Sequence, residues 1–288
     1  MNICAVVVWF NPKELKNPVS NIMSFAIEVD RVYIVDNSSA NNSELASKIQ
    51  NSAYIPLLKN TGIANALNVG CEYAMKDGFE WCMTMDQDSS WNTNNLKRYM
   101  SEVKKNENNY QNFSPTLKFD YIYSFTGNLK TIFHKNKNKK FFDYQHEDRW
   151  ITSGSVMNLS VWCRIGKFNH ELFIDEVDFD YCARFSSEGM RNLCCKNIIL
   201  NHQLGDSKKV LFINYGTHNE FRLYYQIRNL IYMKNKYPNY CYKYRKSYDL
   251  KKIILKEIFL GSGKKMNFFR LLKKAVADSN RMRTTSRE

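Results

Sequence analysis

The stretch Trp81-Cys82-Met83-Thr84-Met85-Asp86-Gln87-Asp88-Ser89-Ser90 is the starting point for predicting the fold. It begins as a short apolar run, which predicts a buried β-strand, and it runs directly into two carboxylates. Open α/β folds bind their ligands at the carboxyl ends of the strands, so both acids are expected at the binding edge of a sheet. Alternate side chains of an extended chain point the same way, and Asp86 and Asp88 can therefore face one cation together.

Oxygen ligands of this kind suit Mg²⁺ or Mn²⁺, and such an ion would neutralise a substrate diphosphate. The alternative interpretation is a polar exit from strand to loop, because Asp and Ser are ordinary turn formers. Asp-x-Asp alone does not separate these two interpretations, so the rest of the chain has to decide between them.

Strands and helices alternate along the first third of the chain. The run 3–10 is continuously apolar and β-branched, which is typical of a strand buried on both faces of a parallel sheet. Short links join the segments, and this pattern predicts a parallel sheet with right-handed crossovers. The predicted strands span 3–10, 32–35, 54–58 and 81–85, and the predicted helices span 19–29, 43–49 and 60–77.

The pattern weakens after residue 96. Residues 97–112 form a polar helix or loop, 116–133 alternate weakly, and 135–140 are a lysine and asparagine turn. Further on, the sequence predicts a strand over 150–159 that lines a cleft, a helix over 179–188, a strand over 198–200 and helices beyond 205. We expect one α/β domain over 1–230, with halves 1–95 and 96–230, and a basic helical extension over 231–288.

The composition indicates a globular protein with an anionic partner. The 288 residues carry 42 Lys and Arg against 28 Asp and Glu, a formal net charge of +14. Nucleic acid, an anionic membrane and a nucleotide-sugar substrate all fit this charge. No apolar run reaches the length of about 18–20 residues that spans a bilayer, and no secretory signal is visible. The eight cysteines include no Cys-x-x-Cys pair, so a reduced, cytoplasmic protein is expected.

Taken in order, eight motifs over about residues 3–230 resemble the large inverting glycosyltransferase family of GT-A fold. Within that family they resemble the rhamnosyltransferase-like branch of bacterial surface-polysaccharide synthesis. Each motif is weak by itself, whereas the ordered series is specific. The motifs are Val7-Val8-Trp9-Phe10-Asn11-Pro12, Val35-Asp36-Asn37-Ser38-Ser39, residues 60–70, Met85-Asp86-Gln87-Asp88-Ser89, Thr152-Ser153-Gly154-Ser155, residues 173–184, His202-Gln203-Leu204-Gly205 and residues 222–229.

The resemblance implies a GT-A fold with a mostly parallel central sheet flanked by helices. It implies transfer of a sugar from a nucleoside diphosphate to an acceptor hydroxyl with inversion, and a divalent cation, Mg²⁺ or Mn²⁺, on the Asp-x-Asp motif. Residues 1–95 would then bind the nucleotide and residues 96–230 the acceptor. Relatives commonly carry Thr where Val7 or Val8 stands here.

The resemblance also assigns roles to single residues. Asp178 matches the catalytic base, six residues before Arg184, although Val177 replaces the usual Glu before it. The expected metal ligands are Asp86, Asp88 and His202. The expected donor-binding residues are Asp36, Asn60, Gly62, Asp86, Arg184, Arg222 and Arg228, and the acceptor-side residues are Ser153, Gly154 and Asp175.

Two other function classes compete with the glycosyltransferase. A nucleic-acid-binding protein would explain the charge and the tyrosines among lysines at 232–248, but the acids at strand ends would repel phosphate without a metal. A non-catalytic sugar- or membrane-binding scaffold would not need every acid. We therefore expect a glycosyltransferase and no nucleic acid as a partner.

The donor and the acceptor are less determined. Family analogy favours dTDP-rhamnose and a growing O-antigen or capsule glycan, free or lipid-linked, while a UDP-hexose or a furanose donor fits the same motifs. The tail carries two basic amphipathic helix patterns around 250–258 and 268–276, separated by Gly261-Ser262-Gly263. These helices can lie on an anionic membrane, which would place the enzyme at the inner face of the cytoplasmic membrane, or can pack on the catalytic domain.

Overall fold

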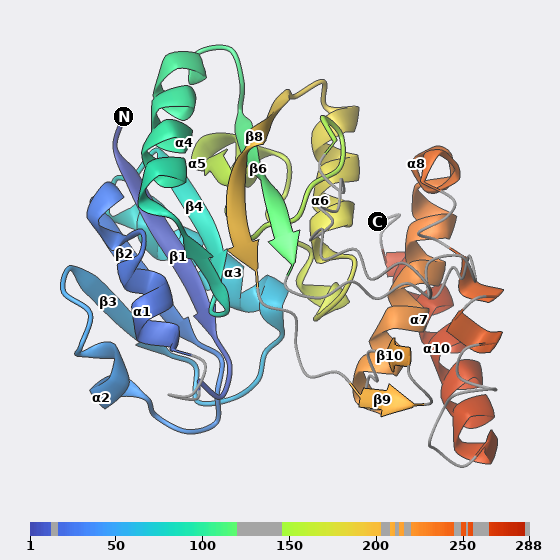
Figure 1. The fold of residues 1–288 in the computed structure, drawn as a ribbon. Helices are drawn as coiled ribbons and strands as arrows, with labels where there is room; N and C mark the ends of the chain where they lie inside the picture. The colour runs from blue at the N-terminus through green and yellow to red at the C-terminus, as the bar shows by residue number, and fades with distance from the viewer. Residues whose placement is uncertain are drawn as a thin grey trace.

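A twisted eight-stranded sheet forms the centre of the protein in the computed structural model (Figure 1). The structure describes residues 1–12, 17–119, 146–202, 208–210, 213–215, 220–244, 249–251, 253–255 and 265–285. The strand order is β3-β2-β1-β4-β7-β6-β8-β5. The strands are β1 (Ile3–Trp9), β2 (Arg31–Asp36), β3 (Ser52–Pro56), β4 (Trp81–Asp86), β5 (Ser89–Trp91), β6 (Asn112–Phe119), β7 (Val156–Asn158) and β8 (Asn192–His202).

The first four strands of this order run parallel, as the sequence predicts. β1 pairs with β2 and β4 on its two sides, and β2 pairs with β3. Their carboxyl ends therefore meet at one edge of the sheet, where Asp36 ends β2 and Asp86 ends β4. Every residue of β1 is buried, which explains its continuous apolar run.

The second half of the sheet is mixed. β7 lies antiparallel between β4 and β6, β6 and β8 are parallel, and β5 pairs antiparallel with β8. The short turn from β4 to β5 therefore brings the Asp-x-Asp stretch beside the end of β8. The register pairs Ser89 with His202.

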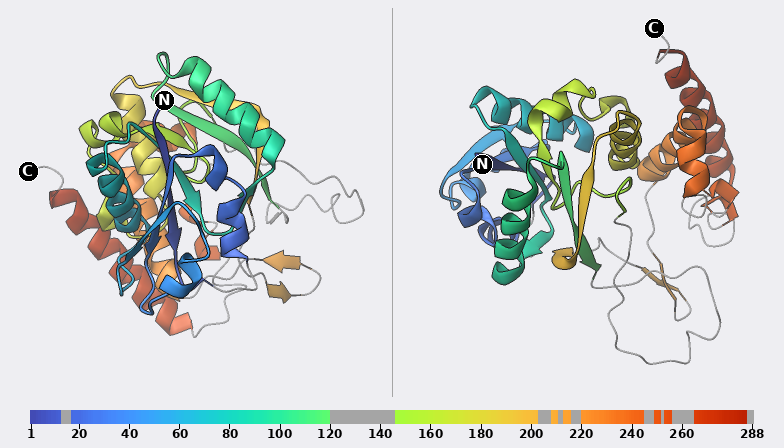
Figure 2. Two further views of the ribbon diagram at one scale, coloured as in Figure 1. Left: turned by 90° about the vertical axis from the view of Figure 1, so that its left-hand side faces the viewer. Right: turned by 90° about the horizontal axis from the view of Figure 1, so that it is seen from above.

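Helices cover both faces of the sheet and form two hydrophobic cores (Figure 2). Odd and even residues of β1 belong to different cores, because successive side chains of a strand point to opposite faces. One face is covered by α3 (Ile63–Lys76), α5 (Leu159–Arg164) and α6 (Val177–Ser187), and the other by α1 (Pro18–Met23), α2 (Ser43–Ala46) and α4 (Thr93–Asn106).

The C-terminal helices form a layer beside the sheet (Figures 1 and 2). α7 (Glu220–Lys236) leads into α8 (Pro238–Lys243), where Pro238 ends the first helix. α10 (Lys265–Thr285) packs along α7 through Leu223, Ile227 and Ala275. Much of the tail's apolar face therefore packs within the protein, since Leu250, Ile253, Phe268, Leu271 and Leu272 join the same cluster.

Three predicted elements differ from the structure. The helix expected over 19–29 is split into α1 and a 3₁₀ turn, Ala26–Glu28. The strand expected over 150–159 is wrong except for β7, because Gly154 has a φ of 81° and turns the chain at 152–155. The strand expected over 198–200 is the end of the longer β8.

The predicted domain boundaries lie within continuous parts of the structure, and three segments of the sequence lie outside the part that it describes. The expected boundary at residue 230 falls inside α7, which continues unbroken to Lys236, and the halves 1–95 and 96–230 share one sheet. The turn at 135–140, the residues 203–205 and the hinge 261–263 lie outside the described residues.

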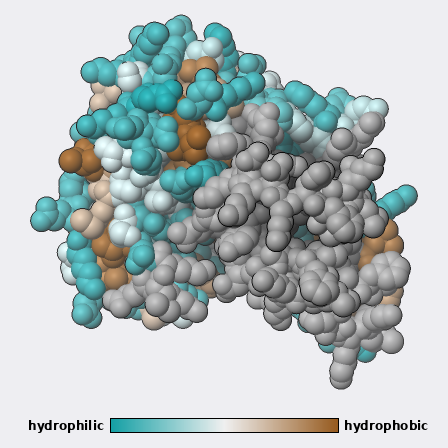
Figure 3. Space-filling view, in the orientation of Figure 1, coloured by the Kyte–Doolittle hydropathy of each residue, from teal (hydrophilic) through white to brown (hydrophobic). Residues whose placement is uncertain are grey.

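In the described part of the chain, no helix has both the length and the apolar character needed to cross a membrane. Hydrophilic residues dominate the described part of the face seen in Figure 3, and the hydrophobic residues on it form small separate patches. A small β-hairpin, β9 (Lys208–Val210) and β10 (Ile213–Tyr215), lies outside the main sheet.

Candidate active site

Asp86, Asp88 and His202 converge at the carboxyl edge of β4, where one ligand atom from each lies within 4.8 Å of the others. Nδ1 of His202 is 3.7 Å from Oδ1 of Asp88 and 4.0 Å from Oδ2 of Asp86. The acids come from the end of β4 and the turn that follows it, and the imidazole comes from the end of β8. Two carboxylates and one imidazole form a donor set that fits a divalent cation such as Mn²⁺ or Mg²⁺.

Two buried serines support this group from behind. The hydroxyl of Ser89 lies 2.6 Å from Nδ1 of His202 and 2.8 Å from the hydroxyl of Ser153. The backbone N–H of Asp86 donates to the Ser153 hydroxyl at 3.2 Å. Both serines are fully buried, so they hold the orientation of the imidazole and the strand end rather than contact solvent.

A tight turn aligns Ser153 with β4. Thr84 donates its hydroxyl to the carbonyl of Thr152 at 2.6 Å, and the N–H of Gly154 donates to the carbonyl of Thr84 at 2.7 Å. A Cβ on Gly154 would stand 2.7 Å from Leu200 Cδ2 and 2.8 Å from Pro115 Cγ, so only glycine fits. The predicted acceptor-side residues Ser153 and Gly154 thus lie behind the acids, buried in the sheet.

Asp178 lies in the first turn of α6 and belongs to the same electrostatic cluster. The backbone N–H of Thr152 donates to its Oδ1 at 3.3 Å. Burial raises the pKa of Asp178, against the hydrogen bonds from Thr152, and the charge of Asp175 raises it further. A carboxyl group with a raised pKa at an acidic edge is suited to accept a proton.

Asp86, Asp88 and His202, here called the metal group, place carboxylates close to one another and to Asp178. Burial, followed by the charges of Asp88 and Asp178, raises the pKa of Asp86 to about 8, although its side chain is 36% exposed at the edge. Burial lowers the pKa of His202, which favours the neutral imidazole that a metal binds. A cation bound here would stabilise the ionised form of Asp86 and the neutral form of His202, so both pKa shifts are consistent with a cation site.

The predicted donor-binding residues divide into two groups. Asp36, Asn60 and Gly62 lie at the carboxyl edge of the parallel strands, in a hydrogen-bonded loop system. Asp36 is 1% exposed and accepts from Ser38 N–H, Asn42 Nδ2 and the hydroxyl of Tyr54. Asn60 Oδ1 accepts from Asn37 Nδ2 and from Gly62 N–H.

The arginines lie elsewhere. Arg184 binds the carboxylate of Asp180 and the carbonyls of Ile165 and Lys167, away from the acidic group. Arg228 donates to the carbonyls of Glu171 and Leu172 and is 8% exposed. The structure therefore gives both arginines internal partners. Arg222 is different, since its charge lowers the pKa of Asp86 and it pairs with Asp175 at 3.0 Å.

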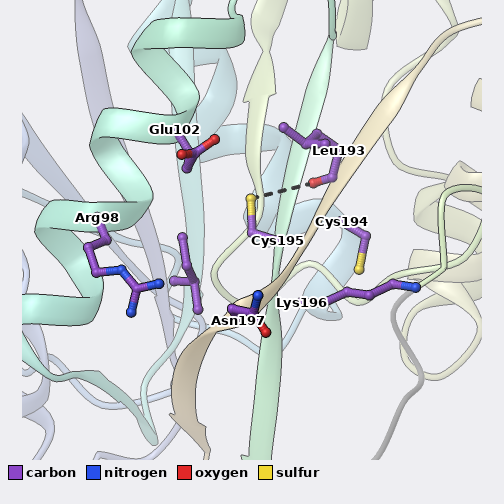
Figure 4. Close-up of a pocket in the computed structure, with 8 residues that line it drawn as sticks. Arg98, Glu102, Leu193, Cys194, Cys195, Lys196 and Asn197 are labelled. Atoms are coloured by element: carbon purple, nitrogen blue, oxygen red, sulfur yellow. Dashed lines mark hydrogen bonds between the residues drawn. The ribbon is translucent and has the colours of Figure 1, made fainter.

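Two hollows in the described part of the chain are lined by residues other than Asp86, Asp88 and His202. A cavity of about 220 Å³ between α4 and β8 (Figure 4) is lined by Arg98, Glu102 and residues 193–198. A second, of about 250 Å³, lies beside α2, between Pro12 and Lys48. Neither contains a metal-group residue or Asp178.

Sequence reasoning did not assign Ser89 or Asn229 a role, although both stand in quoted motifs. Ser89 acquires its contact from the antiparallel pairing of β5 with β8, and nothing in the local sequence announces that pairing. Asn229, Arg222 and Tyr225 all contact the loop before α6 from α7.

Comparisons with known proteins agree with this geometry. The family model described as "Glycosyl transferase family 2" matches residues 4–160. The chain is 31% identical over 248 residues to "dTDP-rhamnosyl transferase RfbF" of Shigella flexneri, covering 82% of each chain.

Two solved structures share the fold at 12% sequence identity. One is GalNAc-T7 with UDP, GalNAc and Mn²⁺, at a TM-score of 0.57 over 97% of this chain. The other is S. aureus TarS 1-349 in complex with UDP-GlcNAc, at a TM-score of 0.56 over 80% of this chain. The present chain spans 54% and 66% of their lengths. The fold and the family match thus lead to one assignment: the chain belongs to glycosyl transferase family 2 and is a glycosyltransferase of GT-A fold.

Proposed function

We propose that the protein transfers a rhamnosyl group from dTDP-rhamnose to a hydroxyl group of a growing bacterial surface glycan, O-antigen or capsule, with inversion at the anomeric carbon. The observation that carries the proposal is the convergence of Asp86, Asp88 and His202 at the strand edge beside Asp178. The similarity to a dTDP-rhamnosyl transferase supports the choice of donor.

Asp178 is the base in this proposal. Its carboxylate accepts the proton of the acceptor hydroxyl while the acceptor oxygen forms a bond to the anomeric carbon. The bond from that carbon to the diphosphate oxygen breaks, and its electron pair leaves with the diphosphate. A divalent cation held by Asp86, Asp88 and His202 would supply positive charge beside the departing group.

The donor is proposed to lie along the carboxyl edge of β1, β2 and β4. Asp36, Asn60 and Gly62 would line the nucleoside side of this edge, and Arg222 would meet the diphosphate because its charge already acts on Asp86. Asp175 is the acceptor-side acid that remains near Asp178. Arg184 and Arg228 are not included, since their donors are occupied by internal carbonyls and Asp180.

We also propose a peripheral contact with an anionic membrane through the outer face of α10, where a lipid-linked acceptor would be held. Phe269 is 53% exposed and Val276 39% exposed, with the exposed bases Arg270 and Lys273 between them. Sedimentation with anionic and neutral vesicles tests this contact. Arg270→Glu with Lys273→Glu should abolish binding, whereas the matched pair Lys104→Glu with Lys105→Glu on α4 should not.

A donor panel tests the proposed reaction. The protein with Mn²⁺ or Mg²⁺ is incubated with dTDP-rhamnose, UDP-glucose, UDP-GlcNAc and a UDP-furanose, and release of the nucleoside diphosphate and thermal shift are measured. We expect dTDP-rhamnose to give the fastest release and the largest shift. Preference for a UDP-sugar would change the proposed donor but leave the proposed reaction in place. If the wild-type protein turned over none of the donors, the proposal would be rejected.

A further inference from the structure

The backbone immediately before the proposed base has an unusual conformation. Phe173, Asp175 and Glu176 have positive φ angles of 64°, 63° and 64°, and none of them is glycine. Phe173 combines its φ with a ψ of −63°, which is the geometry of a strained three-residue turn. Side chains disfavour these regions, so such a segment persists only where its surroundings hold it. Asp178 follows directly in the first turn of α6.

One side chain of α7 holds this segment. Asn229 is fully buried, and its Nδ2 lies 2.8 Å from the carbonyl oxygen of Leu172, 2.8 Å from that of Ile174 and 2.9 Å from that of Asp175. Its two N–H groups are shared among these three acceptors. The three carbonyls flank Phe173 and include that of Asp175, so they lie within the strained segment. They converge on one amide only while the chain keeps its positive φ angles, so the contact selects this loop conformation.

Arg228 fixes the orientation of that amide. Its Nε donates to Oδ1 of Asn229 at 2.8 Å, so the nitrogen of the amide must face the carbonyls. Its Nη2 donates to the carbonyls of Glu171 at 2.6 Å and Leu172 at 3.1 Å. Tyr225 on the same helix stacks on the ring of Phe173 at 4.7 Å. α7 therefore fixes the loop at its carbonyls and at its aromatic side chain.

We propose that Asn229 is a positioning residue that sets the place of Asp178, through the loop 172–176, relative to the metal group. The inference rests on the proposed role of Asp178 as the base. A helix that only needed attachment could use the Phe173–Tyr225 stack, whereas three carbonyls on one amide determine the path of the chain into α6. Loss of the amide would let the loop relax toward negative φ angles and would shift the first turn of α6.

Asn229→Ala tests this inference, and Asn68→Ala is its matched control. Asn68 is also buried and bonds the backbone of Phe168 through both amide atoms, at 2.8 Å and 3.0 Å, but it holds no part of the loop before Asp178. Each variant is measured for thermal stability, for kcat and donor KM with dTDP-rhamnose and Mn²⁺, and for amide hydrogen exchange over 172–178.

We expect both variants to lose stability, because each leaves buried backbone groups without a partner. Only Asn229→Ala should lower kcat, by about 10²-fold at an unchanged donor KM, as a misplaced catalytic group does. Only Asn229→Ala should speed exchange over 172–178. In an Asp178→Asn background the kcat effect of Asn229→Ala should disappear, because a base that is absent cannot be misplaced.

Two results would overturn the inference and one would overturn its foundation. Equal losses of kcat in Asn229→Ala and Asn68→Ala, or exchange over 172–178 that stays at the wild-type rate, would show that Asn229 only anchors α7. An Asp178→Asn enzyme with wild-type kcat would instead reject the base, and the exchange measurement would still report whether Asn229 holds the loop.

Discussion

Arg222 forms a two-point ion pair with Asp175, with Nη2 3.0 Å from Oδ1 and Nε 3.3 Å from Oδ2. The pair bridges α7 and the loop before α6, at the border of the acidic edge. It keeps a guanidinium close enough to Asp86 to lower the pKa of that carboxyl. A cation held in this way is well placed to meet an anionic donor.

The first prediction concerns this guanidinium. Arg222→Ala should weaken dTDP-rhamnose binding about tenfold or more, because charge-assisted hydrogen bonds contribute about 1.5–3 kcal/mol. Isothermal titration with the donor and Mn²⁺ measures the change. Arg31→Ala removes an exposed ion pair with Asp77, outside the site, and serves as the control. If the two variants bound dTDP-rhamnose with equal affinity, Arg222 would not be a donor-binding residue.

The second prediction concerns the metal group. Asp88→Asn should abolish Mn²⁺ binding and with it donor turnover, since an amide replaces one of two carboxylates in a three-residue group. Titration of Mn²⁺ by paramagnetic resonance gives the affinity without reference to activity. Asp77→Asn, at an exposed carboxylate beyond the site, should keep it. Turnover by Asp88→Asn in metal-free buffer would contradict the assignment.

The third prediction is a pH profile. Burial raises the pKa of Asp178, so the base is protonated and inactive at pH values where an ordinary aspartate is already ionised. The logarithm of kcat/KM should therefore fall on the acid side of a midpoint above the usual aspartate range, and the base should be fully active only above it. Steady-state rates from pH 4 to pH 9 would show this limb, measured at saturating Mn²⁺.

Asp178→Asn should remove that limb and about 10²–10⁴ of the rate, while donor affinity stays. It should also raise the melting temperature near neutral pH, because a raised folded-state pKa means that ionisation of Asp178 destabilises the fold as pH rises. If Asp175→Asn is inactive while Asp178→Asn works, Asp175 is the base instead.

The fourth prediction separates two effects of glycine. Gly154 and Gly189 both have positive φ, 81° and 68°, but nothing lies near a Cβ on Gly189, whereas Leu200 and Pro115 would meet one on Gly154. Gly189→Ala should cost only the strain of the left-handed backbone, about 1–2 kcal/mol. Gly154→Ala should cost about 1–3 kcal/mol more, and it should lower activity because the turn carries Ser153. Urea unfolding of both variants measures the difference.

The sequence predicts the parallel half of the sheet closely because its signals are local. β1 reads as a buried strand from residues 3–10 alone, and the acids at 36, 86 and 88 follow strands directly. The turn at 152–155 was mistaken for strand because its apolar frame suggests burial, while its path depends on Gly154 and on Thr84 in another strand. Tertiary context decided this segment.

The candidate site divides in the same way. The sequence motifs predict site roles for Asp86, Asp88, His202 and Asp178. In the structure, ligand atoms of the first three lie within 4.8 Å of one another. Arg184 and Arg228 carry the charge expected of donor ligands, but backbone carbonyls that no sequence pattern reveals bind both of them. The sequence does not predict roles for Ser89 and Asn229, because the role of a small polar side chain depends on the residues that the fold places beside it.

The strand order has a consequence for how the protein becomes active. Asp86 and Asp88 stand at and just after the end of β4, early in the chain, whereas the imidazole stands at residue 202 and reaches them only when β8 is in place beside β5 and β6. A shortened chain that ends before His202 lacks one of the three side chains of the proposed metal group. If the proposed metal role holds, Mn²⁺ affinity would report that β8 has reached its place beside β5 and β6, which helix content alone does not.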